Sequence, residues 1–386
     1  MDNQITGVPT ETAGQVVTTE TVGQVVSAET AVNVMPEKKG ITGSTLKLIA
    51  IGTMLIDHTA AVVIDSFLNR AGMNAAMTSG DVEKIMEFNA RYAWLSMVDT
   101  IMRCIGRLAF PLFIFLLVQG FMHTRNKAKY AFRLFLFAII SEIPFNLALT
   151  GHAFSPLFKG VTFGYQSVYW TLLAGFLFMC FADLISTKKI PTPLGVLASI
   201  VMVAASGFTL SCGCSGFING FVSVESTLNG GNMDNEALRA EALKVQIVLM
   251  VLFAIGMLIF FTIYCIKNSY EKGCVLAVSV IGLCVLMLAA HFGNTDYGMW
   301  GVLAIALGYA FRKKNTSSLT GSVIILTIMN FIEAFAFIDL VFIKNYNGKR
   351  GLKLKYVFYA FYPVHLFLLY TISWFMGCQP GKFLGF

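Results

Sequence analysis

Long apolar stretches recur along most of the chain and predict helices that span a membrane. A helix needs roughly 20 mostly apolar residues to cross a hydrocarbon core about 30 Å thick. The stretches do not alternate as the short strands of a lipid-facing barrel do. We therefore predict an all-α fold, a polytopic bundle of about ten transmembrane helices. The predicted spans are residues 46–67, 104–122, 130–150, 165–186, 190–211, 245–266, 273–291, 296–311, 319–343 and 356–377.

Polar segments precede and separate these spans. From Glu11, ETAGQVVTT, ETVGQVVSA and ETAVNVMPE follow one another as a degenerate repeat. Three short copies cannot bury a core, so residues 1–44 are predicted to form a disordered tail. Residues 45–386 are the predicted membrane domain, in which residues 68–103 and 212–243 are expected to be extended loops.

Each of these two loops contains a candidate helix. The segment DVEKIMEFNARYAWLSMV fits an amphipathic helix at the membrane interface as well as it fits a polar loop helix. The segment MDNEALRAEALK is typical of a short helix capped by Asn232 or Asp234. The N-terminus has no positively charged segment next to an apolar one, so no cleavable signal peptide is expected.

Composition supports the membrane interpretation and excludes other classes. Hydrophobic residues make up 56% of the chain and charged residues 13%, whereas a soluble domain carries about 25% charge. The net charge of +7 comes from basic residues scattered over short loops, without a basic patch among exposed aromatics, so no nucleic-acid partner is expected. Cys212 and Cys214 lack a second pair at zinc-site spacing, so no metal site is expected.

The loop charges predict an orientation, with one conflict. The loops after the second, fourth, sixth and eighth predicted spans carry ten of the Lys and Arg residues, which places these loops and both termini in the cytoplasm. The segment KNYNGKRGLKLK, residues 344–355, would then lie outside with five basic residues. Either the orientation is wrong, a span is miscounted, or this loop is basic for a functional reason. In each case we expect a multi-pass protein of the cell membrane, surrounded by lipid.

Ionisable side chains inside the predicted spans are costly and by default indicate function. Six of them fall in the same half of the membrane on the ten-span arrangement, and Pro111, Pro144 and Pro363 lie close to three of these. Because a membrane proline frees a backbone carbonyl, this combination favours a hydrated cavity. The alternative is a structural ion-pair network that locks the bundle. The six residues are Asp57, His58, Arg107, Glu142, Asp296 and His365.

Helix geometry predicts how some of these side chains are arranged. Asp57 and His58 point about 100° apart on a helix, so they must serve different partners. Tyr362 and His365 are three residues apart and share a face. Histidine suits proton transfer from an amine or a hydroxyl because its unperturbed pKa lies near neutral pH.

Four stretches of the chain resemble the TraX family, integral membrane proteins associated with N-terminal acetylation of conjugative F-type pilin. They are LKLIAIGTMLIDH, residues 105–146, DYGMWGVLAI, and YNGKRG followed by FYAFYPVHL. More distantly, Lys47 followed by an apolar helix and His58 is similar to the first span of the membrane acyltransferases that acetylate polysaccharides. In that superfamily the corresponding histidine is held to be catalytic.

The resemblance implies an acetyltransferase that moves an acetyl group from acetyl-CoA to an amine or hydroxyl of a peptide, protein or glycan. We expect His58 to act as the general base, with Arg107, Tyr362 or His365 stabilising the oxyanion. The catalytic candidates are His58, Asp57, His365, Tyr362, Arg107 and Glu142. The candidates for binding the CoA phosphates, which positive-inside loop charge also explains, are Arg125, Lys127, Lys129, Arg133 and Lys47. The candidates for binding the acceptor are Asp296, Tyr297, Asn347, Lys349, Arg350, Asn146 and Gln166.

Two other functions fit the same residues. Intramembrane Asp, Glu and His also build the proton relays of transporters. Transporters usually show inverted repeats with matched broken helices, and the proline-containing spans of this chain are not matched pairs. A non-catalytic assembly scaffold is the third possibility, and it predicts that alanine is tolerated at both His58 and His365.

Overall fold

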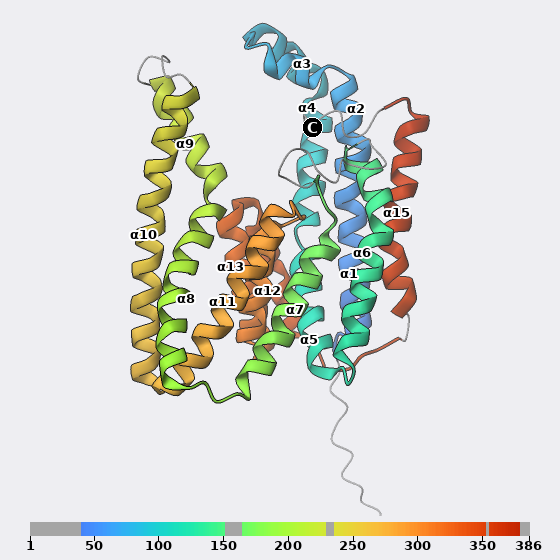
Figure 1. Ribbon diagram of the computed structural model, residues 1–386. Coiled ribbons are helices and arrows are strands. Elements are labelled where there is room, and N and C mark those ends of the chain that lie inside the picture. Colours follow the sequence, from blue (N-terminus) through green and yellow to red (C-terminus); the bar gives the residue numbers. More distant parts are fainter. Residues whose placement is uncertain (1–39, 151–163, 229–234, 353–354, 379–386) are drawn as a thin grey trace, which may run out of the picture. The chain divides into compact units, whose positions relative to one another are not determined.

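The structure, a computed structural model, describes residues 40–150, 164–228, 235–352 and 355–378. Within these residues the regular structure is helical, and residues 40–386 form one compact unit (Figure 1). Most of the predicted repeat tail, residues 1–39, lies outside the described residues, as do the proposed capping residues Asn232 and Asp234. The all-α prediction is confirmed.

The helices follow one another with short connections. They are α1 (Gly43–Thr59), a π-helical turn η1 (Ala60–Ile64), α2 (Asp65–Arg70), α3 (Met73–Thr78), α4 (Val82–Gly106), α5 (Ala109–His123), α6 (Lys127–Thr150), α7 (Val168–Ser186), α8 (Thr192–Gly213), α9 (Ser215–Leu228), α10 (Asn235–Lys267), α11 (Tyr270–Phe292), α12 (Gly298–Ala310), α13 (Asn315–Met329), a 3-10 helix η2 (Phe331–Ile338), α14 (Asp339–Lys344) and α15 (Lys355–Phe375).

Eight helical segments of the described chain are long and apolar enough to cross a membrane. Two of them combine neighbouring helices, residues 43–70 and residues 82–123. The other six correspond to α6, α7, α8, α10, α11 and α15, while α12 and α13 are apolar but shorter. The protein is therefore a polytopic helical bundle, with fewer full-length spans than the ten predicted.

The two predicted extended loops are helical, which corrects that part of the prediction. Residues 68–103 contain α3 and most of α4, because Phe88, Tyr92 and Leu95 of α4 pack against Leu68 and its neighbours. Residues 212–243 contain α9 and the start of α10, and α9 buries Ile218 and Val222, which are four residues apart on one face. Mixed charge in the first segment and the Gly, Ser and Asn residues of the second made both segments resemble loops.

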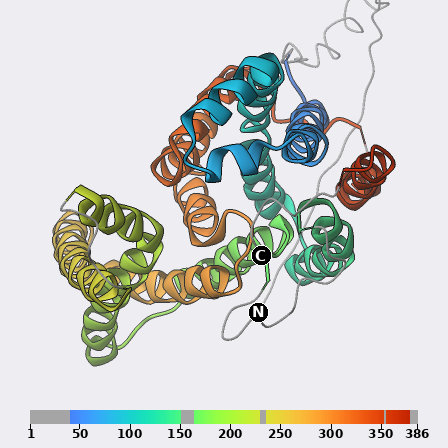
Figure 2. The same ribbon diagram turned by 90° about the horizontal axis from the view of Figure 1, so that it is seen from above.

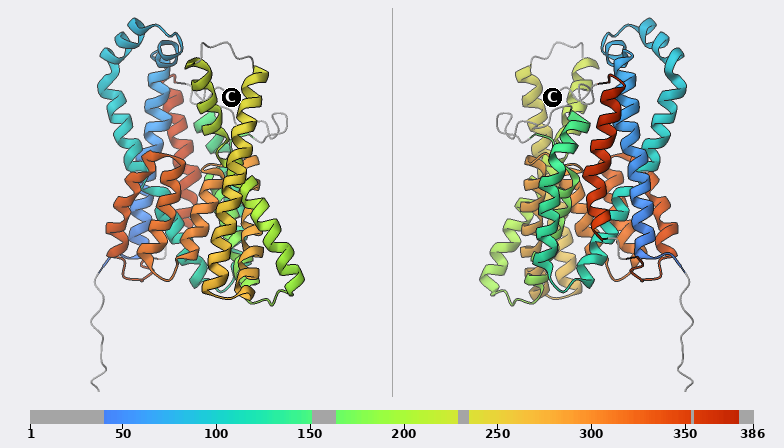
Figure 3. Two further views of the ribbon diagram at one scale, coloured as in Figure 1. Left: turned by 90° about the vertical axis from the view of Figure 1, so that its left-hand side faces the viewer. Right: turned by 90° about the vertical axis from the view of Figure 1, so that its right-hand side faces the viewer.

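Residues 319–343 do not form a single span either. The segment α13 ends at Met329, the side chain of Asn330 caps η2 by accepting a hydrogen bond from Ile332 N–H, and η2 and α14 pack back along α13. Figure 3 shows this helical hairpin among the surrounding helices. We name it the re-entrant hairpin, residues 315–344.

Both ends of the re-entrant hairpin lie at the same end of the bundle. At its start, Asn315 accepts a hydrogen bond from Gln119 near the end of α5. After its last residue, Asn345 O accepts a hydrogen bond from Ile41 N–H, just before α1. The ends of α5 and α14 and the start of α1 meet in one apolar cluster around Leu46, Phe115 and Ile343. The hairpin thus enters and leaves on one side, because polar residues at its tip interrupt what would otherwise be a continuous apolar span.

This geometry removes the conflict over orientation. The described part of the basic segment, residues 344–352, lies beside the start of α1, at the same end as the Lys and Arg residues that follow α5 and α12. We refer to this end as the basic end. The described chain starts at the basic end and finishes at the opposite one, where Arg70 donates a hydrogen bond to Met376 O. Ten crossings would bring the chain back to the side on which it starts. The described chain ends on the opposite side, so the prediction of ten complete crossings is wrong for residues 40–378.

The re-entrant hairpin makes a topological prediction. In a background without the native cysteines, Lys344→Cys and Lys313→Cys are expected to react with a membrane-impermeant maleimide from the same side of the membrane. Glu83→Cys, in the first turn of the long α4, is expected to react only from the other side. Opposite labelling of positions 313 and 344 in right-side-out and inverted vesicles would contradict the hairpin.

Asp339 carries a buried carboxyl group without a partner in the described part of the chain. Its side chain is 0% exposed, and neither carboxyl oxygen makes a hydrogen bond. Because a buried polar group without a hydrogen bond costs about 1–3 kcal/mol, Asp339→Ala is expected to stabilise the protein by about 1 kcal/mol after the loss of side-chain packing. The measurement is the unfolding midpoint in detergent micelles. Asp339→Asn keeps an unpaired polar group and is expected to change that midpoint little; a large loss with Ala would show that the carboxyl has a stabilising role.

Candidate functional site

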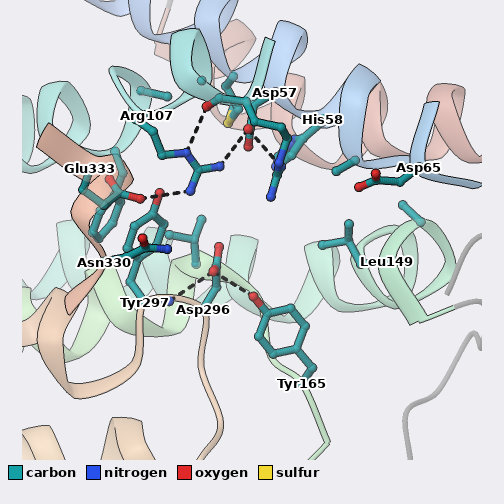
Figure 4. Close-up of a pocket in the computed structure, with 18 of the residues that line it drawn as sticks. Asp57, His58, Asp65, Arg107, Leu149, Tyr165, Asp296, Tyr297, Asn330 and Glu333 are labelled. Atoms are coloured by element: carbon teal, nitrogen blue, oxygen red, sulfur yellow. Dashed lines mark hydrogen bonds and ion pairs between the residues drawn. The ribbon is translucent and has the colours of Figure 1, made fainter. Parts of the chain in front are cut away.

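The ends of several helices surround a cavity of about 550 Å³. Its walls come from the last turns of α1 and from α2, the break between α4 and α5, the end of α6, the start of α7, the start of α12 and the tip of the re-entrant hairpin (Figure 4). These are the helix ends that lie away from the basic end. In Figure 2 the end-on view shows α8, α9 and α10 standing apart from these helices, linked to them through α11.

A network of ion pairs forms one wall of the cavity. Arg107 donates to Asp57 Oδ1 at 2.7 Å and to Glu333 Oε1 at 2.9 Å, and Arg103 donates to the same Asp57 oxygen at 2.9 Å. The side chains of Asp57 and Arg107 are each 13% exposed and Glu333 is fully buried. Gly106 permits the close approach, since a Cβ there would lie 2.2 Å from the Cβ of Asp57. This network ties α1, α4 and η2 together.

Two histidines from distant parts of the chain form a hydrogen bond beside this network. His58 Nδ1 lies 2.7 Å from His365 Nε2, and the two rings stack with centroids 5.0 Å apart. His365 Nδ1 lies 2.7 Å from Phe361 O, which can only accept, so His365 Nδ1 carries a proton. In neutral His365 the other nitrogen then accepts, and His58 Nδ1 is the donor. His58 Nε2 is left with a free lone pair, and His58 lines the cavity.

The segment before α12 forms the opposite wall. Tyr165 donates to Asp296 Oδ1 at 2.9 Å, and Gln166 pairs with this segment through backbone hydrogen bonds to Asn294 and Asp296. Tyr297 has a left-handed backbone, with φ of +60°, and its ring stacks on Phe110 with centroids 3.8 Å apart. A bulky residue in this conformation is strained, and such strain clusters at functional sites.

Three of the predicted site residues lie behind the wall of the cavity. Glu142 Oε1 accepts hydrogen bonds from Ser167 N–H at 2.9 Å and from the indole N–H of Trp170 at 2.8 Å. Asn146 donates to Glu142, and Gln166 bonds mainly to backbone atoms. None of the three lines the cavity as described. Glu142 anchors the start of α7. Its position does not support its prediction as a residue that contacts the reacting groups.

The predicted phosphate-binding residues lie at the basic end. Lys47 Nζ lies 5.2 Å from the centre of the Phe358 ring, and the helical rise places Lys47 about 16 Å from His58 along α1. Arg133 lies over Tyr130, whereas Lys127 makes an ion pair with Asp183 at 2.5 Å. Exposed Arg125 and Lys129 flank the start of α6.

Three predicted acceptor-binding residues lie at the basic end as well. The carbonyl oxygens of Lys349 and Arg350 accept hydrogen bonds from Gly43 N–H and Ser44 N–H, and Asn347 donates to Gly40 O. The structure therefore separates Asn347, Lys349 and Arg350 from Asp296 and Tyr297 by most of the length of α1.

Several cavity residues were not among the sequence candidates. Arg103 precedes Arg107 by one helical turn. If all of residues 81–103 had been assigned to a helix, this spacing would have identified Arg103 as a site candidate. Glu333 and Asn330 come from the re-entrant hairpin, which the sequence hid within an apolar run. Two further ones are Asp65, seven residues after His58 on the same helical stretch, and Tyr165.

The fold and the site together define a multi-pass helical membrane protein with a charged internal cavity. A model of the TraX family, described as TraX protein, matches residues 42–224 and 237–373, and the chain belongs to the TraX family. A relative in Dichelobacter nodosus, described as probable fimbrial assembly protein FimC of serogroup H1, is 23% identical over 333 residues. That alignment covers 86% of this chain and 95% of the relative. No solved structure matches the chain.

Proposed function

We propose that the protein is an integral membrane acetyltransferase that uses acetyl-CoA and the His58–His365 pair. The observation that carries the proposal is the position of His58 at the cavity wall, with its Nδ1 held by His365, which is held in turn by Phe361 O. An orienting partner behind a histidine is the arrangement that general-base catalysis requires. Membership of the TraX family, associated with pilin acetylation, supports the reaction class.

In the proposed reaction, His58 Nε2 removes a proton from the acceptor amine or hydroxyl as that group attacks the thioester carbonyl. A carbon–nitrogen or carbon–oxygen bond forms and the carbon–sulfur bond breaks. The proton then passes from His58 to the departing sulfur, giving the free thiol of CoA. The protein contributes position and proton transfer, which together supply much of the rate in such reactions.

The two substrates approach from opposite ends of the bundle in this proposal. The positive-inside rule places the basic end in the cytoplasm, where acetyl-CoA is made. Lys47 and Arg133 lie at that end on helices that lead toward His58, so they are the side chains best placed to hold the CoA phosphates.

The acceptor enters from the other end. Asp65, Asn69 and Asn294 line the cavity far from the basic end, and Asp65 makes no ion pair among the described residues. A carboxylate at this position favours an acceptor that arrives with a positive charge or a donating hydroxyl, such as an amine or a sugar.

The test uses purified protein in liposomes with acetyl-CoA labelled in the acetyl group, supplied on the side of the basic end. Peptides with a free N-terminus and cell-envelope glycans are offered on the other side. Transfer of label to either acceptor class supports the proposal and names the acceptor. A substrate-driven pH change without consumption of acetyl-CoA would overturn it in favour of a proton-coupled transporter.

A further inference from the structure

Acyl transfer generates a negatively charged oxygen, and most charged donors near His58 are already engaged. Arg107 bonds through one terminal nitrogen to Asp57 and through the other to Glu333, and its Nε donates to Arg103 O. His365 has both ring nitrogens committed, to His58 and to Phe361 O. His365 therefore has no donor free for a developing oxyanion in this arrangement, and Arg107 has committed three of its five N–H groups to protein oxygens.

Tyr362 has a hydroxyl group that is not engaged. It lines the cavity, its side chain is only 3% exposed, and its hydroxyl makes no hydrogen bond within the described part of the chain. The Tyr362 ring lies edge-on to His58, with centroids 6.0 Å apart. A buried hydroxyl without a partner costs about 1–3 kcal/mol, so its retention beside the base requires an explanation.

The start of α7 faces the same hydroxyl. Val168 also lines the cavity, and the ring of the next residue, Tyr169, lies edge-on to the Tyr362 ring with centroids 5.2 Å apart. The α7 helix has 19 residues, and its N-cap Ser167 makes no side-chain capping bond. The first amides of such a helix carry unsatisfied N–H groups and the positive end of the helix dipole. Glu142 fixes this end by binding Ser167 N–H, and Trp170 N–H donates to Ser167 O, which leaves the amides of Val168 and Tyr169 without an acceptor in the described part of the chain.

We infer that the Tyr362 hydroxyl and the first-turn amides of α7 form the oxyanion-binding subsite for the acetyl carbonyl. The inference rests on the proposed acetyl transfer. As the acceptor attacks and its proton moves to His58 Nε2, the carbonyl oxygen gains the electron pair of its π bond. Tyr362 donates a hydrogen bond to that oxygen without losing its proton, and the pair returns to the carbonyl when the carbon–sulfur bond breaks. Tyr362 is a catalytic residue in this scheme, while Glu142 is a positioning residue.

The kinetic test compares Tyr362→Phe with Tyr370→Phe, the same chemical change two turns further along α15 and outside the cavity. Loss of one oxyanion donor typically lowers kcat by about 10²-fold, which is the loss expected for Tyr362→Phe, with KM for acetyl-CoA little changed. Tyr370→Phe is expected to keep the original kcat. Equal kcat in the two variants would overturn the inference.

A spectroscopic measurement separates a direct contact from a structural effect. In protein carrying His58→Ala, which holds the donor without turnover, isotope-edited infrared spectra report the carbonyl stretch of bound ¹³C-acetyl-CoA. Adding Tyr362→Phe is expected to raise that frequency, because the carbonyl loses a donor, and adding Tyr370→Phe is expected to leave it unchanged. An unchanged frequency with Tyr362→Phe removes the subsite but leaves the acetyltransferase proposal standing. Absence of any bound donor signal in the original protein overturns both.

Discussion

Replacing His58 with alanine is expected to lower the acetyl-transfer rate by about 10²- to 10⁴-fold, the range of a lost general base. The reason is the fixed tautomer: His58 Nδ1 donates to His365, so Nε2 is the only ring nitrogen available to take a proton. The rate is measured under single-turnover conditions with labelled acetyl-CoA in liposomes, so that donor binding and product release do not mask the chemical step.

The matched control is His123→Ala at the exposed end of α5, where the imidazole bonds only to Gln119 O among the described residues. This variant is expected to keep the original rate. His365→Ala should cost less than His58→Ala, since it frees the tautomer of His58 without removing the base. If protein with His58→Ala is folded and transfers acetyl at the original rate, His58 is not the base.

Replacing Arg107 with methionine is expected to destabilise the protein by about 3–5 kcal/mol, as for other buried charge networks that lose one partner. Methionine is of similar length but leaves Glu333, which is fully buried, and Asp57 without their shared cation. The loss is measured as a shift of the unfolding transition in an SDS titration of detergent-solubilised protein.

The compensating variant provides the control. When Arg107→Met is combined with Glu333→Gln and Asp57→Asn, the buried charges disappear together, and most of the lost stability should return. Lys127→Met, which removes a partly exposed cation from its pair with Asp183, is expected to cost less than about 1 kcal/mol. A loss for Arg107→Met as small as that of Lys127→Met would show that the network does not hold α1, α4 and η2 together.

Helices with a uniform apolar pattern were predictable from the sequence, and helices with mixed patterns were not. The bounds of α6, α7, α8 and α11 lie within a few residues of the prediction. A continuous apolar run in lipid satisfies its backbone hydrogen bonds within the segment by forming a helix. The N-terminal half of α4 was predicted only as a candidate helix within a loop, and the re-entrant hairpin was misassigned as one span. In the first, charges on one face hid a packed helix, and in the second, apolar side chains hid a reversal of the chain at Asn330.

The site was predictable where helical spacing alone decided the outcome. The rule that Asp57 and His58 must serve different partners holds, since Asp57 binds two arginines and His58 binds His365. The partners of residues far apart in the sequence could not be predicted. Nothing in the residues themselves distinguishes Glu333, which binds Arg107, from Glu142, which binds the start of α7. Those choices depend on how helices far apart in the sequence pack together.

The re-entrant hairpin also constrains how the protein is synthesised. With 15 residues, α13 is about 22 Å long, too short to leave the insertion machinery as an independent crossing. Its tip carries Asn330 and Glu333, and Glu333 becomes neutralised only on meeting Arg107, made more than 200 residues earlier. The hairpin must therefore dock after the preceding helices have assembled, so the cavity closes as one of the last events of biogenesis.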